Sequence, residues 1–262
     1  MELPSELGGW SIPALGAVAS LVAGVATGVG ALPVLFTRNV SQRAQDVMLG
    51  FGAGVMLAAT SFSLIVPGIE AGGGDVAAAF VVAAGIGLGG LFLWLLEHYA
   101  PHEHFLKGRE GAERTQLSRI WLFVIAITLH NFPEGLAVGV GFGTGDLREG
   151  LTLATGIGLQ NLPEGLVVAL ALVGQRYSVG RALLVALCTG LVEPIGGIIG
   201  AGLVSVSQPL LPWGLAFAAG AMLYVVSDEI IPETHRKGFE TEATLGVMVG
   251  FVVMMVLDTT LG

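Results

Sequence analysis

Two six-residue blocks place closely spaced polar side chains in the apolar middle of this chain. The blocks read His130-Asn131-Phe132-Pro133-Glu134-Gly135 and Gln160-Asn161-Leu162-Pro163-Glu164-Gly165. Side chains four residues apart lie on one face of a helix, so the first and fifth residues of each block point the same way. A charged side chain at the centre of a bilayer costs at least ~2.5 kcal/mol on insertion scales. Two glutamates in matching positions therefore predict a functional site.

The donor atoms of these blocks suit a divalent cation. The side chains with donor atoms are His130, Asn131, Glu134, Gln160, Asn161 and Glu164. One nitrogen, several oxygens and no thiolate form a set for a metal of borderline softness, and two carboxylates neutralise its charge. The prolines also leave the carbonyls of Leu129 and Leu159 without their helical partners, which is tolerated at mid-membrane where backbone lines a cavity.

A third acidic residue, Glu193, lies at a similar depth and is followed by Pro194. Three buried carboxylates without a lysine or arginine at that depth repel one another and take up protons. One metal, or two metals sharing a bridging glutamate, would remove the repulsion. The alternative is a protonated, hydrogen-bonded cluster that only holds helices together.

The composition is that of a polytopic helical membrane protein. Of 262 residues, 53% are hydrophobic, 12% are charged and 41 are glycine, and the mean hydropathy is +0.81. A soluble domain of this length would need more charged surface, and glycine lets membrane helices approach closely. The net charge of −9 gives no indication of nucleic-acid binding, and the single cysteine, Cys188, is interpreted as a packing residue. We expect no cleavable signal peptide, because no basic residue precedes Arg38.

Eight apolar segments are long enough to cross a hydrocarbon core of ~30 Å. They are placed at 11–36, 44–69, 76–99, 118–143, 150–174, 180–205, 211–233 and 242–261. The predicted fold class is therefore all-α, a single transmembrane domain spanning residues 1–262. The polar stretch 100–118 is predicted to be a loop.

The basic residues predict the orientation. Ten of the eleven lie in alternate loops and only Arg148 lies on the other side. Because cytoplasmic loops are enriched in lysine and arginine, these alternate loops, with 100–118 among them, are predicted to be cytoplasmic. Both termini would then lie outside the cytoplasm.

Other polar side chains lie where an ion could enter or leave. Towards the outer side these are Met56, Ser63 and Glu70, spaced seven residues apart. Towards the cytoplasm they are Asp228, Glu229, Glu233 and His235, with His102 and His104 in the loop. Packing, helix–helix hydrogen bonding or a solvated surface is the alternative role for each, and Glu97 and His98 share this ambiguity.

The two blocks also suggest internal symmetry. The segments that carry them run in opposite directions, and both hold N-x-P-E-G at about mid-depth. Related motifs on antiparallel neighbours are typical of transporters built from inverted repeats.

These residues resemble the ZIP family (Zrt/Irt-like proteins) of divalent metal transporters, in particular its GufA-type bacterial branch, over essentially the whole chain. The resemblance implies eight spans and a binuclear site. The residues matching the primary site are His130, Glu134, Gln160 and Glu164, and those matching the second are Asn131, Asn161 and Glu193 with the shared glutamates. Met56 and Ser63 match the entrance side, and Asp228 and Glu229 the exit side. Some relatives carry an aspartate where this chain has Asn161, which bears on the second site.

The predicted function is movement of Zn²⁺, and of related ions such as Cd²⁺, iron or manganese, into the cytoplasm. The resemblance implies an elevator-like motion of segments 1, 4, 5 and 6 against segments 2, 3, 7 and 8, with a homodimer formed through the latter group. A cation channel of the same fold is the alternative. A membrane metalloenzyme is disfavoured, because the helical H-E-x-x-H motif does not occur in the sequence.

Overall fold

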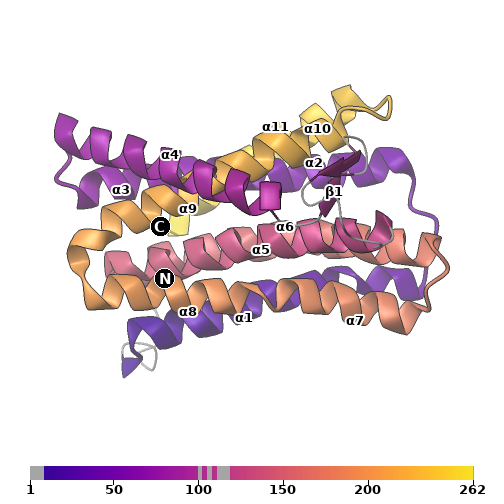
Figure 1. The fold of residues 1–262 in the computed structure, drawn as a ribbon, viewed down its shortest axis with the longest axis horizontal. Helices are drawn as coiled ribbons and strands as arrows, with labels where there is room; N and C mark the ends of the chain where they lie inside the picture. The colour runs from indigo at the N-terminus through magenta and orange to yellow at the C-terminus, as the bar shows by residue number, and fades with distance from the viewer. Residues whose placement is uncertain (1–8, 100–101, 105–107, 111–118, 262) are drawn as a thin grey trace.

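The computed structural model describes residues 9–99, 102–104, 108–110 and 119–261, and its long elements are helices (Figure 1). These are α1 (Ile12–Gly30), α2 (Gln42–Ala58), α3 (Val66–Ala71), α4 (Val76–Tyr99), α5 (Arg119–Gly141), α6 (Leu147–Gly174), α7 (Val179–Gly190), α8 (Glu193–Val206), α9 (Leu211–Val225), α10 (Ile231–Thr234) and α11 (Glu240–Leu261). Short 3₁₀ turns are η2 (Leu32–Leu35), η4 (Phe142–Thr144) and η5 (Gln208–Leu210), and π-helical segments are η3 (Ala59–Ile65) and η6 (Val226–Ile230).

Eight stretches of the described chain are long and apolar enough to cross a membrane. They are Ile12–Leu35, Gln42–Ala71, Val76–Tyr99, Ile120–Thr144, Leu147–Gly174, Val179–Val206, Gln208–Thr234 and Glu240–Leu261. The predicted all-α class and the eight spans are confirmed. Several spans are assembled from consecutive helices; the sixth is broken between α7 and α8, where Pro194 lies in the first turn of the second piece.

A small hairpin occurs inside the segment predicted to be a loop. Strands β1 (His102–His104) and β2 (Gly108–Glu110) pair antiparallel, with His102 opposite Glu110. The pairing is local and adds no layer to the helical architecture. The hairpin and α10 lie at one end of the bundle, and α1 begins and α11 ends towards the other (Figure 1).

The helices form two groups. The motif bundle, as we call it, consists of α1, α5, α6, α7 and α8, in which α1 packs on α6 and α8, and α5 packs on α8. The second bundle consists of α2, α3, α4, α9, α10 and α11, in which α2 packs on α11 and α4 on α9. In Figure 1, α4 and α11 lie along the upper side, α1, α7 and α8 along the lower side, and α5 between them. The two groups meet mainly where α5 contacts α9 and α6 contacts α2.

Glycines of the two sequence blocks set the spacing inside the motif bundle. A Cβ at Gly135 on α5 would overlap the backbone carbonyl of Glu193 on α8, and a Cβ at Gly165 on α6 would overlap that of Thr27 on α1. These helices therefore meet backbone to backbone, which is the packing that small residues allow in membranes. The glycine that ends each N-x-P-E-G motif thus serves helix packing.

The second bundle is held by the same kind of contact. A Cβ at Gly54 on α2 would overlap the carbonyl of Val247 on α11, and a Cβ at Gly220 on α9 would overlap that of Ile86 on α4. Each group is therefore closely packed within itself.

Capping side chains explain where three of the helices begin. Ser11, Ser41 and Ser178 precede α1, α2 and α7, and each hydroxyl accepts a hydrogen bond from the backbone N–H three residues further on. This contact satisfies one of the N–H groups that a helix start leaves without a partner.

Substituting Gly135 by alanine should destabilise the fold. Relief of the clash requires α5 and α8 to separate, and overpacking costs about 1–3 kcal/mol, or roughly 4–10 °C in melting temperature for a chain of this size. The control is Gly87→Ala on α4, where a Cβ would have nothing within 4 Å. Thermal unfolding in detergent measures both, and equal melting temperatures would contradict the packing argument.

Candidate metal centre

The donor side chains of the two blocks are buried side by side in the motif bundle. The exposed fractions are 4% for His130, 0% for Asn131, 1% for Glu134, 0% for Gln160, 0% for Asn161 and 5% for Glu164. Pro133 and Pro163 lie inside α5 and α6, which continue through them. A hydrogen bond from Gln160 Nε2 to Glu134 Oε1, 2.5 Å long, joins the two helices at this level. The structure thus brings the two predicted blocks together.

Glu193 joins this group from α8. It is fully buried in the first turn of that helix, directly after the break that follows α7. Its Oε1 accepts a hydrogen bond of 2.7 Å from Nδ2 of Asn161. The break in the sixth span therefore presents a carboxylate to α6.

Most of these side chains keep a buried oxygen without a hydrogen-bond partner. Among the described residues these atoms are Asn131 Oδ1, Glu134 Oε2, Gln160 Oε1, Asn161 Oδ1, Glu164 Oε2 and Glu193 Oε2. Buried polar atoms are satisfied in the large majority of cases, so a group of unsatisfied oxygens requires an explanation. A divalent cation would satisfy several of them at once, and carboxylate, amide and imidazole donors suit an ion of borderline softness.

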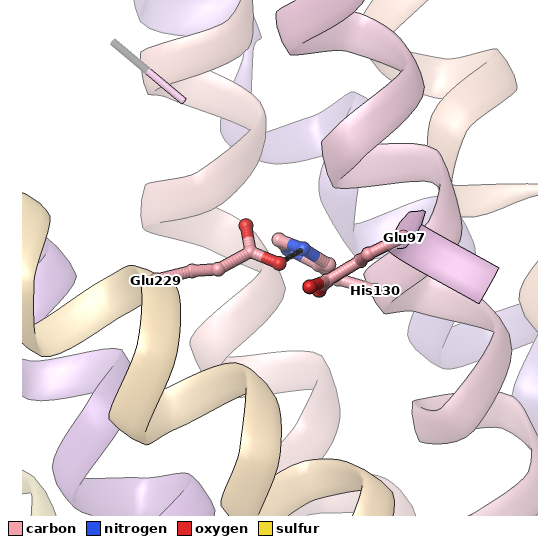
Figure 2. A group of neighbouring side chains, drawn as sticks. All are labelled: Glu97, His130 and Glu229. Atoms are coloured by element: carbon pink, nitrogen blue, oxygen red, sulfur yellow. Dashed lines mark hydrogen bonds and ion pairs between the residues drawn. The ribbon is translucent and has the colours of Figure 1, made fainter. Parts of the chain in front are cut away.

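His130 also takes part in a second cluster. Its Nε2 is hydrogen-bonded to Oε1 of Glu229, which lies in η6. One donor atom from each of Glu97, His130 and Glu229 lies within 4.8 Å of the others. Figure 2 shows the three side chains turned towards one another from different helices. All three residues are buried, so this cluster is a second arrangement that could hold a metal ion.

The sequence left the role of Glu97 undecided. It lies in the last turn of α4 and is only 4% exposed. An acidic residue near the end of a uniformly apolar segment is ordinarily assigned to the solvated helix end. Helices α4 and α5 both pack against α9, and in this arrangement Glu97 lies near His130. The sequence gives no sign of that proximity.

A cavity of about 310 Å³ connects both clusters to one end of the bundle. His130, Glu164 and Glu229 line it together with the predicted pathway residues Asp228 and Glu233. Its basic lining residues are Arg38, Arg236 and Lys237. Lys237 Nζ pairs with Glu233 Oε1 at 2.6 Å. We call this end the basic end.

Buried apolar side chains pack together on the other side of the blocks. Met56, Leu153, Ile157 and Met222 are at most 1% exposed and belong to one hydrophobic cluster. Leu153 and Ile157 precede Gln160 on α6 and therefore lie on the side away from the basic end. Met56, predicted as an entrance residue, is part of this packing.

Other predicted pathway residues have structural partners. Ser63 donates a 2.5 Å hydrogen bond to Asp258 on α11, a helix–helix contact that the sequence left open as an alternative. Nε2 of His235 lies 2.9 Å from the hydroxyl of Thr244, which links the end of α10 to α11. Glu70 is exposed. The side chains of His102 and His104 lie outside what the structure describes.

Both π-helical segments are followed by a proline. Pro67 comes two residues after η3, and Pro232 two residues after η6. A proline cannot donate the usual helical hydrogen bond, and π segments are frequent at functional sites. In η6 the widened turn carries Glu229.

Replacing Glu97 by glutamine should weaken divalent-cation binding at the second cluster. The change keeps the shape of the side chain but leaves the cluster with one carboxylate instead of two. We therefore expect about 10-fold lower affinity for Zn²⁺. The matched control is His98→Gln, because His98 is exposed and stacks on Trp94. Calorimetric titration of the purified protein measures both variants. Binding of Glu97→Gln that equals the control would show that this carboxylate contacts no ion.

Comparison with known proteins places this arrangement in a family. A family model described as ZIP Zinc transporter matches residues 97–258. The chain is 55% identical to "Zinc transporter GufA" of Myxococcus xanthus, covering 94% of this chain and 99% of that protein. It is 53% identical to "Zinc transporter ZIPB" of Bordetella bronchiseptica, covering 90% and 78%. It is 36% identical to "Zinc transporter ZIP11" of Homo sapiens, covering 90% and 94%. The chain therefore belongs to the ZIP family of divalent metal transporters, in its GufA-like branch.

Proposed function

We propose that this protein moves Zn²⁺ across the bacterial inner membrane into the cytoplasm. The observation that carries the proposal is the buried group of carboxylate, amide and imidazole donors on two proline-bearing helices, connected to one end of the bundle by a cavity. The names of its relatives support zinc as the ion. Cd²⁺, iron and manganese use similar nitrogen and oxygen donors, so we expect them to compete with zinc.

The primary site is proposed to consist of His130, Glu134, Gln160 and Glu164. A second ion would share the two glutamates, with Asn131, Asn161 and Glu193 as its further ligands. The unpartnered oxygens of these residues support both positions. Amides bind metals weakly, which suits a site that must release its ion.

The contacts of His130 suggest a route of release. Its imidazole belongs to the α5 block and also reaches Glu229, which lies beside Glu97 and lines the cavity. A swing of this side chain would transfer the ion from the primary site to the two carboxylates. Asp228 and Glu233 line the next part of the cavity.

An elevator-like movement is the mechanism that the packing favours. Glycine-mediated backbone contacts hold the motif bundle together, and separate ones hold the second bundle together. In this conformation the cavity beside the site opens to the basic end, and buried apolar side chains of α2, α6 and α9 pack together on the opposite side. We propose that the motif bundle slides against the second bundle to reverse this access. A channel would need no such movement.

Charge supports the orientation. The cavity opens among Arg38, Arg236 and Lys237, and basic residues are enriched on the cytoplasmic side of membrane proteins. Both termini would then be extracytoplasmic. We further propose a homodimer formed through the second bundle, where α4 exposes Val76 and Phe80 and α11 exposes Leu245.

Removing a primary ligand should abolish saturable transport. His130→Ala and Glu134→Gln each delete a donor to the ion, and we expect at least a 100-fold loss of Zn²⁺ uptake into proteoliposomes. The controls are His98→Ala and Glu240→Gln, at exposed positions of α4 and α11. A well-folded Glu134→Gln variant with unchanged flux would contradict the site.

A disulfide between the two bundles should stop transport. An ideal Cβ at Gly214 on α9 lies 3.9 Å from Cβ of Val140 on α5, which is close to the mean for disulfides. In a Cys188→Ser background, oxidised Val140→Cys/Gly214→Cys is expected to be inactive and to recover on reduction.

The matched control links two helices of the second bundle. An ideal Cβ at Gly68 on α3 lies 3.5 Å from Cβ of Leu215 on α9, so Gly68→Cys/Leu215→Cys can form a disulfide without joining the two bundles. We expect this control to transport zinc. Full transport by the oxidised inter-bundle pair would contradict the sliding movement and favour a channel.

A further inference from the structure

The asparagines of the two N-x-P-E-G motifs have different contacts. Asn131 and Asn161 are both fully buried, but neither amide atom of Asn131 has a hydrogen-bond partner among the described residues. Nδ2 of Asn161, in contrast, donates to the carbonyl oxygen of Ala23 on α1 at 2.8 Å and to Oε1 of Glu193 on α8 at 2.7 Å. Matching positions in the two motifs therefore have different roles.

The contact with Ala23 fixes the orientation of the Asn161 amide. A backbone carbonyl can only accept hydrogen bonds, so the nitrogen of the amide must face α1 and the oxygen must point away. Consistent with this, Oδ1 of Asn161 is buried and unpartnered. Both hydrogen bonds join protein groups directly and require no metal ion.

Asn161 connects its own helix α6 to α1 and α8 at the level of the site. One turn further along α6, Gly165 packs against the backbone of Thr27 on α1. Glu193 lies directly after the break between α7 and α8, at the first position of the second helix. Asn161 therefore adds a polar link to α1 and determines where the Glu193 carboxylate lies.

We propose that Asn161 is a positioning residue that holds Glu193 and α1 against α6 without a metal ion, so that the motif bundle stays assembled when the carrier is empty. The inference rests on the proposed zinc site and sliding movement. A carrier must return without its cargo, and hydrogen bonds donated by an amide persist in that state. A carboxylate at this position would face two acceptors, the carbonyl of Ala23 and the Glu193 carboxylate, and would need a proton or a metal ion between them.

The test compares Asn161→Asp with Asn131→Asp in the full-length protein purified in detergent. Both changes replace a side-chain NH2 group by a carboxylate oxygen in the same buried group, but only the NH2 group of Asn161 donates hydrogen bonds that are then lost. In EDTA, Asn161→Asp should melt about 5 °C or more below Asn131→Asp, because two buried hydrogen bonds are lost. Added Zn²⁺ should close most of this gap. Equal melting temperatures in EDTA would overturn the proposal.

A double variant tests the hydrogen bond itself. In Asn161→Asp/Glu193→Gln, the glutamine amide can donate to the new aspartate, which reverses the direction of the wild-type hydrogen bond. The double variant should therefore recover at least half of the stability that Asn161→Asp loses in EDTA. Its melting temperature should also depend less on zinc. Melting no higher than Asn161→Asp would count against the proposal. If Asn161→Asp does not fold, a double variant that folds in EDTA supports the proposal. A double variant that fails while Glu193→Gln folds overturns it.

The zinc site and the link at Asn161 can fail separately. If the proposed function is wrong, the wild-type protein will show neither heat of zinc binding nor a zinc-dependent melting temperature. The comparison of variants in EDTA would still report on the hydrogen bonds, because it contains no metal.

Discussion

The burial of acidic side chains inside a membrane-spanning bundle is the constraint on which this structure depends. Glu134, Glu164 and Glu193 are each at most 5% exposed, and the amides of Gln160 and Asn161 donate hydrogen bonds to Glu134 and Glu193. Carboxylates in such surroundings are costly without a counter-charge. In the proposed function, a mobile divalent cation supplies that charge and can also leave. The prolines within α5 and α6, the break before α8 and the unpartnered oxygens all occur where these acidic side chains are buried.

Glycine residues allow the helices within each bundle to pack closely. Backbone-to-backbone contacts at Gly135 and Gly165 keep the helices of the site at fixed spacing, and Gly54 and Gly220 do the same in the second bundle. Two bundles that are each closely packed can move past one another with little internal distortion, which is what alternating access requires. The site lies within one bundle, while Glu97 and Glu229 belong to the other. Movement between the bundles would therefore change which carboxylates His130 can reach.

The sequence alone was sufficient for the eight spans and for the proximity of the two motifs, because apolar length and the cost of buried charge are local signals. It was not sufficient for the partners of those motifs. The contact of His130 with Glu229 joins residues 99 positions apart, and that of Ser63 with Asp258 joins residues 195 positions apart. Such contacts depend on how helices pack, and glycine-rich segments permit many packings. The different roles of Asn131 and Asn161 follow from their neighbours on α1 and α8, which the motif itself does not specify.

Anomalous diffraction at the zinc absorption edge, from crystals of the purified protein grown with Zn²⁺, tests the central claim most directly. Coordination by Glu134 and Glu164 predicts the strongest peak between α5 and α6, about 2.0–2.2 Å from carboxylate oxygens of both residues. A weaker peak beside Glu97 and Glu229 would fit the proposed route of release. Zinc bound only elsewhere, for example beside Glu70 or Asp258, with both motif glutamates free of metal, would contradict the account.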